Sequence, residues 1–244
     1  MKKLLSTLAL SMLFCSVAVA SPLTDYSQGH WSIDLTERNT TNSFLMTPSL
    51  TESLDFKNKY NFDGTVTVGL GHKFAVQYRN FQPKSSTFTY VIGSDTNTYN
   101  LNVKTSEFNV LYKLNNSTSA LVGLIRASGN YVYTYQYSSD VDSWITDIQA
   151  KSFWQVGFVS SSELASNTTA WCMAAIGKHL TNYEVGVSYK LCKNMEFNVN
   201  YRELKLRDFA LTKNEYDNGT FVASESDIGG LATNGLGFGL TYKY

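Results

Sequence analysis

Most of the chain alternates between apolar and polar residues, so that every second side chain has the same character. A period of two is typical of β-strands with two unlike faces. The alternation is clearest in segments whose apolar residues span 31–35, 66–70, 74–78, 108–114, 154–158, 183–191, 195–201 and 236–244. The sequence therefore predicts an all-β protein.

Alternation alone fits a soluble β-sandwich as well as a membrane barrel. Aromatic residues stand at the ends of many of these apolar faces, as the interfacial girdle of a membrane barrel requires. The opposite face carries charges of both signs, which are costly to bury in a sandwich core. Short and long connections also alternate along the chain. Together these features favour a closed, antiparallel, up-and-down transmembrane β-barrel.

The connections predict the number of strands. Four are short, at 71–72, 115–118, 165–169 and 192–194, and four are long, at 38–62, 82–105, 130–150 and 206–233. If the short ones face the periplasm together with both termini, the barrel has ten strands and the long ones face outward. Only 177–182 is short on the outer side. The segment 171–176 alternates poorly, and eight strands result if it is not a strand.

Residues 1–20 have the organisation of a secretory signal peptide. Lys2 and Lys3 precede an apolar core from Leu4 to Phe14, and the small residues 18–20 form a cleavage site. The apolar core is too short to span a bilayer. We therefore expect export to the periplasm, with residues 21–244 forming one barrel domain.

The last ten residues resemble the closing strand of bacterial outer-membrane proteins. In those proteins the chain ends on an aromatic residue preceded by alternating apolar residues, and the outer-membrane assembly machinery recognises this strand. The corresponding assembly-signal residues here are Leu236, Phe238, Leu240, Tyr242 and Tyr244. With its leader and strand pattern, the chain resembles small outer-membrane barrels of the OmpA/OmpX type, without a C-terminal periplasmic domain. The resemblance implies a location in the cell outer membrane, in contact with its lipid and lipopolysaccharide.

The strand register also predicts which charged side chains face the lumen. Ten strands leave little open space inside, so most of these charges should pair with one another. The predicted lumen charges are Asp34, Arg79, Glu107, Lys113, Arg126, Lys151, Glu184, Lys190, Glu196, Arg202 and Lys243. The bases outnumber the acids by three, which predicts a small leak with a weak preference for anions.

Composition excludes some functions. Lys2 and Lys3 lie in the leader, which leaves 18 basic and 20 acidic residues and argues against a nucleic-acid partner. The three histidines, His30, His72 and His179, fall in separate parts of the predicted barrel, so we expect no metal site and no cofactor. The chain has no HExxH, nucleophile-elbow, phosphate-loop or calcium-loop motif. A non-enzyme is expected, and an outer-membrane hydrolase using His179 near the outer rim is an alternative.

Two further features concern the ends of the barrel. Cys172 and Cys192 fall near the periplasmic ends of neighbouring predicted strands and are candidates for a disulfide, which the periplasm permits. The long outer connections are rich in acids: 138–150 contains three aspartates and no base. The favoured function is a structural, adhesive or surface-interaction role through these connections, with an unidentified extracellular ligand. A narrow pore for small solutes is the main alternative.

Overall fold

The computed structural model describes residues 23–46, 53–137 and 140–244, so the predicted signal peptide lies outside the described residues. No helix within these ranges is long and apolar enough to cross a membrane. Eleven strands account for most of the described chain: β1 (Trp31–Met46), β2 (Ser53–Gly71), β3 (Phe74–Phe81), β4 (Phe88–Ile92), β5 (Asp95–Lys113), β6 (Thr118–Tyr137), β7 (Asp140–Ala165), β8 (Thr168–Gly177), β9 (Leu180–Cys192), β10 (Met195–Asp217) and β11 (Thr220–Lys243).

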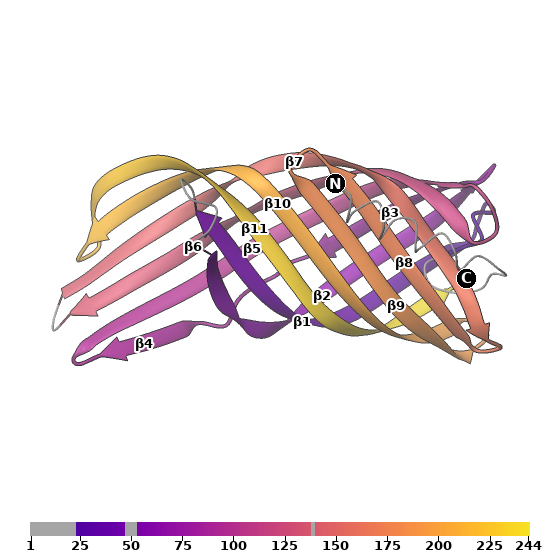
Figure 1. The fold of residues 1–244 in the computed structure, drawn as a ribbon, viewed down its shortest axis with the longest axis horizontal. Coiled ribbons are helices and arrows are strands. Elements are labelled where there is room, and N and C mark those ends of the chain that lie inside the picture. The colour runs from indigo at the N-terminus through magenta and orange to yellow at the C-terminus, as the bar shows by residue number, and fades with distance from the viewer. Residues whose placement is uncertain (1–22, 47–52, 138–139) are drawn as a thin grey trace, which may run out of the picture.

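Ten of these strands form a closed ring (Figure 1). Neighbours in the chain pair antiparallel from β5 to β11 and from β1 to β3, β11 pairs with β1, and β3 pairs with β5. The short strand β4 stands outside the ring and extends the sheet along β5. The predicted ten-stranded barrel is therefore confirmed. The poorly alternating segment 171–176 lies within β8, which rules out the eight-stranded alternative.

The start of β1, the C-terminus and four tight turns gather at one end of the barrel. The turns after β2, β5, β7 and β9 all lie there, and hydrogen bonds between Trp31 and Tyr244 join the start of β1 to the end of the chain. The amide of Trp31 donates to the Tyr244 carbonyl at 3.1 Å, and the amide of Tyr244 donates to the Trp31 carbonyl at 2.9 Å. In bacterial outer-membrane barrels this end faces the periplasm.

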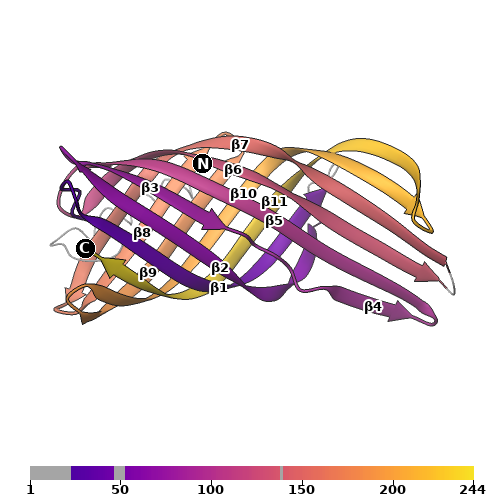
Figure 2. The same cartoon turned by 180° about the vertical axis from the view of Figure 1, so that it is seen from behind.

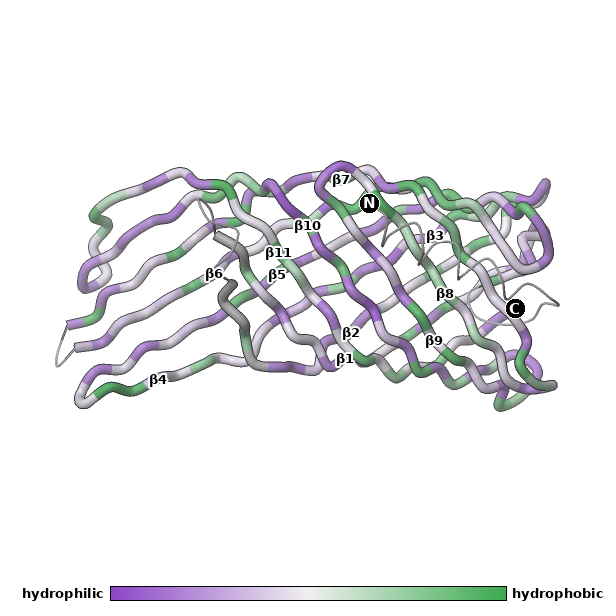
Figure 3. Tube along the Cα trace, in the orientation of Figure 1, coloured by the Kyte–Doolittle hydropathy of each residue, from purple (hydrophilic) through white to green (hydrophobic). Residues whose placement is uncertain are grey.

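A band of exposed apolar side chains surrounds the half of the barrel nearest this end. On β11, for example, Leu236, Phe238, Leu240 and Tyr242 are each 40–46% exposed, while the alternate residue Thr241 is fully buried. Ring pairs such as Trp31–Tyr244 and Phe74–Tyr112 lie at the lower border of the band. Figure 3 shows the alternation as successive green and purple stretches along the strands. Such a band is what the hydrocarbon core of a membrane requires.

The predicted long outer loops are largely strands. β5, β6, β7, β10 and β11 continue without a break through most of 95–105, 130–150 and 206–233. Their hairpins project far beyond the apolar band, as Figures 1 and 2 show at the end opposite the C-terminus. β8 and β9 stop earlier, at the turn 178–179, and above this turn β7 pairs directly with β10. The expectation of outward loops is thus wrong for these segments.

The inward and outward faces of the strands exchange their polarity at the level where the hairpins begin to project beyond the apolar band. Along the inward face of β5, Leu101 and Val103 are apolar and Glu107 is polar; along its outward face, Lys104 is polar and Phe108 is apolar. The lower part of β5 faces lipid on the outside, whereas the upper part faces water and buries its inner face. We call the projecting residues 88–105, 127–151 and 205–233 the extracellular wall.

Candidate functional site

Six buried charged side chains from six strands meet in the middle of the lumen. Arg38 of β1, Arg79 of β3 and Arg202 of β10 face Asp63 of β2, Glu107 of β5 and Glu184 of β9, and all six are at most 9% exposed. Three positive and three negative formal charges therefore cancel within one layer. We call these six residues the lumen network.

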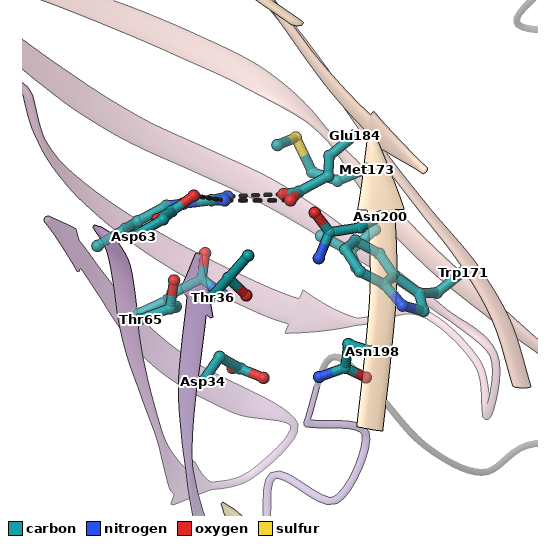
Figure 4. Close-up of a pocket in the computed structure, with 12 residues that line it drawn as sticks. Asp34, Thr36, Asp63, Thr65, Trp171, Met173, Glu184, Asn198 and Asn200 are labelled. Atoms are coloured by element: carbon teal, nitrogen blue, oxygen red, sulfur yellow. Dashed lines mark hydrogen bonds and ion pairs between the residues drawn. The ribbon is translucent and has the colours of Figure 1, made fainter. Parts of the chain in front are cut away.

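The ion pairs of the network connect opposite sides of the barrel. Glu184 accepts from Arg38 Nη2 at 2.7 Å and from Arg79 Nη1 at 2.6 Å. Arg79 Nε also donates to Asp63 Oδ1 at 2.7 Å, so one guanidinium bridges two carboxylates. In Figure 4 the dashed lines run between Asp63 and Glu184, the two acids that Arg79 joins. Buried charges held in this way resist any displacement that separates them.

Neutral amides extend the network towards β7. Gln155 Nε2 donates to Glu107 Oε1 at 2.7 Å, and Asn182 Nδ2 donates to Gln155 Oε1 at 3.2 Å. Arg202 then donates to Asn182 Oδ1 at 3.1 Å and to Glu107 Oε2 at 2.7 Å. The space left beside the network is a cavity of ≈ 60 Å³, lined by Asp34, Trp171 and polar neighbours (Figure 4). One water needs about 10–15 Å³ on this measure, so the cavity has room for a few waters and no larger solute.

Apolar side chains fill the lumen above the network. Phe44, Leu101, Ile125, Leu204 and Leu206 all have no exposed surface and belong to one hydrophobic cluster that also includes Phe153 and Phe209. The sequence prediction of a polar lumen is therefore incomplete, because the inward face becomes apolar where the outward face meets water.

The segment 23–30, which precedes β1 and is called the N-terminal segment below, closes the lumen at the end with the short turns. Leu23 and Tyr26 are buried against Leu111 and Leu121, and the Tyr26 hydroxyl donates to Ser119 Oγ at 2.9 Å. Gly69 permits this approach, since a Cβ there would lie 2.5 Å from the Ser27 carbonyl oxygen. The lumen is thus closed at three levels: the N-terminal segment, the charged network and the apolar cluster.

The predicted lumen charges fall into distinct environments. Arg79, Glu107, Glu184, Glu196 and Arg202 are buried, and Asp34 lines the cavity. Lys243 Nζ lies 3.0 Å from Glu196 Oε1, and Lys113 Nζ donates to the Thr24 carbonyl at 3.0 Å. Lys190 is exposed near the short-turn end, opposite Glu196.

Arg126 is the exception, because its predicted inward orientation is wrong. Its side chain is exposed, whereas its neighbours Ile125 and Ala127 are buried in the lumen cluster. The outward face of β6 becomes polar at this residue, so a base is compatible with the outside. The sequence reasoning also missed Arg38, which falls in the predicted connection 38–62, and Asp63, which directly follows it. Continuing the alternation from Asp34 through Thr36 would have placed Arg38 inside.

The predicted disulfide is not formed: within the described chain, no S–S bond joins Cys172 to Cys192. Cys172 lies opposite Val185 on β9, and Cys192 is seven residues further along that strand. At about 3.3 Å per residue this separates the two positions by roughly 23 Å, whereas a disulfide needs Cα atoms within about 7 Å.

His179 lies at the rim where β8 and β9 end. Its Nε2 is 3.8 Å from Asp208 Oδ2, and Lys151 Nζ is 2.7 Å from the same carboxylate oxygen. The hydrogen bond from Lys151 is the largest cause that holds the pKa of Asp208 below its usual value. Asp208 stands at an irregularity of β10, with φ of 66°. These contacts join β7, β10 and the β8–β9 turn. They lie at the level above which β8 and β9 are absent and β7 pairs directly with β10.

The tips of the extracellular wall bring acids together from two hairpins. Asp140, Asp142 and Asp217 line a recess of ≈ 300 Å³ with Tyr135 and Tyr137. The pKa of Asp142 is raised, first by loss of hydration and then by the charges of Asp217 and Asp140. No group of histidine, cysteine and acidic side chains in the described ranges is arranged to hold a metal ion.

The closed ring, its apolar outer band and the pairing of its first and last strands define the fold of a small transmembrane β-barrel of the bacterial outer-membrane type. Its outer-membrane location follows from the same features.

No protein-family model matches the chain, and no curated protein matches it significantly. Among solved structures it is similar to Ail, the attachment invasion locus protein of Yersinia pestis, with 11% identity, a TM-score of 0.40 and coverage of 89% of this chain and 99% of Ail. It is also similar to the outer membrane protease OmpT from Escherichia coli, with 12% identity, a TM-score of 0.47 and coverage of 94% and 99%. The Pseudomonas putida toluene transporter TodX has 8% identity, a TM-score of 0.34 and 88% coverage of both chains. These neighbours have unlike functions, so the likeness concerns the fold alone.

Proposed function

We propose that the protein is an occluded outer-membrane barrel that acts at the cell surface, by binding a basic partner through its extracellular wall. The observation that carries this proposal is the closure of the lumen at three levels beneath strands that continue well beyond the membrane band. A barrel built to pass solutes needs an open lumen. Long paired strands outside the membrane instead provide a stable surface for recognition.

Contacts between aromatic rings tie together four neighbouring strands of the wall. Phe88 of β4 lies 6.0 Å from Tyr99 of β5, which lies 4.8 Å from Tyr133 of β6; Tyr133 lies 5.0 Å from Trp144 of β7. Such pairs each stabilise a sheet by about 0.5–1.5 kcal/mol beyond burial. A surface ordered before binding loses less conformational entropy when a partner binds.

The charge of the wall supports a basic partner. Across the wall the acids outnumber the bases nine to five, and 127–150 contains no base. The acids of the tip recess lie at the ends of the β6–β7 and β10–β11 hairpins, which project at the end opposite the C-terminus (Figure 1). A surface of one sign attracts partners of the opposite sign, and the attraction weakens with salt.

Conductance tests the occlusion. The full mature chain, folded in planar bilayers, should show no steady single-channel conductance, and Arg202→Glu, which removes one base of the lumen network, should not create a stable channel of either selectivity. A large, stable conductance in the unmodified protein would refute the proposed occlusion and favour the pore.

Binding tests the wall. Bacteria displaying the protein should attach to polylysine-coated surfaces better than bacteria without it, and attachment should fall as salt is raised. The variant Asp140→Asn/Asp142→Asn/Asp217→Asn should lose most of this gain, whereas Glu225→Gln/Asp227→Asn on the exposed edge of β11 should lose less. Equal attachment with and without the protein, at equal surface expression, would refute a basic partner.

A further inference from the structure

Arg126 stands in a polar row that crosses four strands on the outside of the barrel. Asn80 of β3 lies opposite Ser106 of β5, Ser106 lies opposite Arg126 of β6, and Arg126 lies opposite Ser152 of β7. Because residues opposite each other in a sheet share one face, Arg126 is flanked by two serines on the outer face of the sheet.

The next row towards the periplasm is apolar on the same four strands. It consists of Tyr78, Phe108, Leu124 and Trp154, which are paired in the same order. Trp154 is 70% exposed and Phe108 is 50% exposed, as side chains in contact with lipid must be. The Tyr78 hydroxyl accepts from Asn80 Nδ2 at 3.3 Å, so this phenol points up to the polar row. The border of the membrane band therefore falls between these two rows.

Positive charge collects on the outer side of this border. Lys104 of β5 is exposed in the row above Arg126, opposite Ser128, and Lys84 lies opposite Asn102 one row further. Among the described residues, no acid forms an ion pair with Arg126 or Lys104.

At several other points of the rim the charge is compensated or acidic. On β10, Lys205 pairs with Glu203, and on β1 the exposed residue at the border is Glu37. On β7 the outward acid Asp147 lies opposite Asn130, two rows above Arg126. In the β5–β7 sector, two bases without an ion-pair partner thus stand directly above an apolar row that includes three aromatic residues.

We propose that Arg126 and Lys104 bind the phosphate groups of a phosphorylated glycolipid in the outer leaflet. A guanidinium offers two parallel N–H donors to a phosphate, Lys104 supplies a second charge, and the flanking serines can donate further hydrogen bonds. The acyl chains lie below, over Phe108, Leu124 and Trp154. A lipid is favoured over a free phosphate because the apolar row adjoins the charges within one step of the register, about 7 Å along the strands. This site is separate from the acidic tips and goes beyond the proposed surface function.

The test uses the full mature barrel in detergent, with lipid A as the probe. Binding is measured by native mass spectrometry for lipid A carrying both phosphates and for the same lipid with its phosphates removed. The unmodified barrel should prefer the phosphorylated lipid by about tenfold or more, and Arg126→Ser/Lys104→Ser should remove the preference. Arg126→Lys should retain part of it, and Lys213→Ser, high in the wall, should retain all of it.

Folding is checked for each variant by the different gel mobility of unboiled and boiled samples, so that misfolded protein is not counted as non-binding. No preference for phosphate in the unmodified barrel would overturn the proposal, as would an undiminished preference in the folded double variant. Binding of inorganic phosphate at Arg126 with equal affinity would also overturn it, since the acyl chains would then contribute nothing.

Discussion

Glu107→Gln should destabilise the barrel by about 3 kcal/mol, because it leaves the buried charge of Arg202 without its closest partner. Arg202 Nη2 lies 2.7 Å from Glu107 Oε2, and the two side chains are 2% and 4% exposed. Removing one member of a buried ion pair costs about 3–5 kcal/mol. The lower end applies here because Asp63 Oδ2, 3.9 Å from Arg202 Nη1, still provides a counter-charge.

A double-mutant cycle separates the ion pair from the other contacts of Glu107. Arg202→Met alone should also be costly, since it leaves Glu107 as an uncompensated acid. The combination Glu107→Gln/Arg202→Met removes both charges and should cost at least about 1.5 kcal/mol less than the sum of the single changes. Glu225→Gln, on the exposed upper edge of β11, is the control and should change stability by less than about 0.5 kcal/mol.

The free energy of unfolding is measured by urea titration in detergent micelles, followed by tryptophan fluorescence and by the mobility of unboiled samples. Additive single changes, within about 0.5 kcal/mol, would show that Glu107 and Arg202 are not coupled. A cost below about 1 kcal/mol for Glu107→Gln would show that the lumen is hydrated enough to screen these charges. Either result would refute the description of the network as an interlocked layer of buried ion pairs.

Three further predictions concern other parts of the molecule. Because the ring leaves no open sheet edge in the membrane, unboiled and boiled samples should migrate differently in SDS, with a strand-dominated circular dichroism spectrum; equal mobility and a helical spectrum would contradict the barrel. Deleting Tyr244, an exposed residue of the predicted assembly signal, should lower the outer-membrane yield, whereas Lys243→Ala should assemble nearly normally; equal yields would contradict the facing of this strand. The pKa of Asp142, followed by NMR, should lie above 3.8 and should fall in Asp217→Asn. Because a raised pKa in the folded state disfavours ionisation of Asp142, the tip should lose stability as the pH rises from about 3.8 through that pKa. An unchanged pKa of Asp142 in the variant would contradict the contact with Asp217.

The ring of strands could be predicted because lipid imposes a strict alternation. On β9 and the lower parts of β10 and β11, every second residue contacts hydrocarbon, so the pattern in the sequence is nearly free of exceptions. The wall escaped prediction because the same strands exchange their faces. Leu204 and Leu206 continue inward after Arg202, so the apolar residues change sides in mid-strand and the alternation reads as a break. The lower part of each of these strands faces lipid and the upper part faces water, so the two parts have different hydropathy patterns. The pattern of the upper part resembles that of a loop.

Side-chain placement was least predictable where both faces of a strand are alike. Arg126 lies between Ile125 and Ala127, with Leu124 two residues away on its own face, so hydropathy alone assigns no side to it. The disulfide prediction failed for a different reason, since the distance between Cys172 and Cys192 depends on the register of β8 against β9. That register is set by pairing partners and turn geometry, which a single sequence does not reveal.

The position of Arg126 relates the two proposed sites to each other. The wall begins one row above it, so phosphate groups held at Arg126 and Lys104 would define how far the tips stand from the bilayer. The acids of the tips lie on other strand segments, at the ends of the β6–β7 and β10–β11 hairpins. Neutralising the tip acids should therefore abolish the attachment of bacteria to polylysine without changing the preference for phosphorylated lipid A. Arg126→Ser/Lys104→Ser should abolish the preference for phosphorylated lipid A in detergent without changing the attachment of bacteria to polylysine. Loss of both properties in either variant would mean that one surface, and not two, serves both ligands.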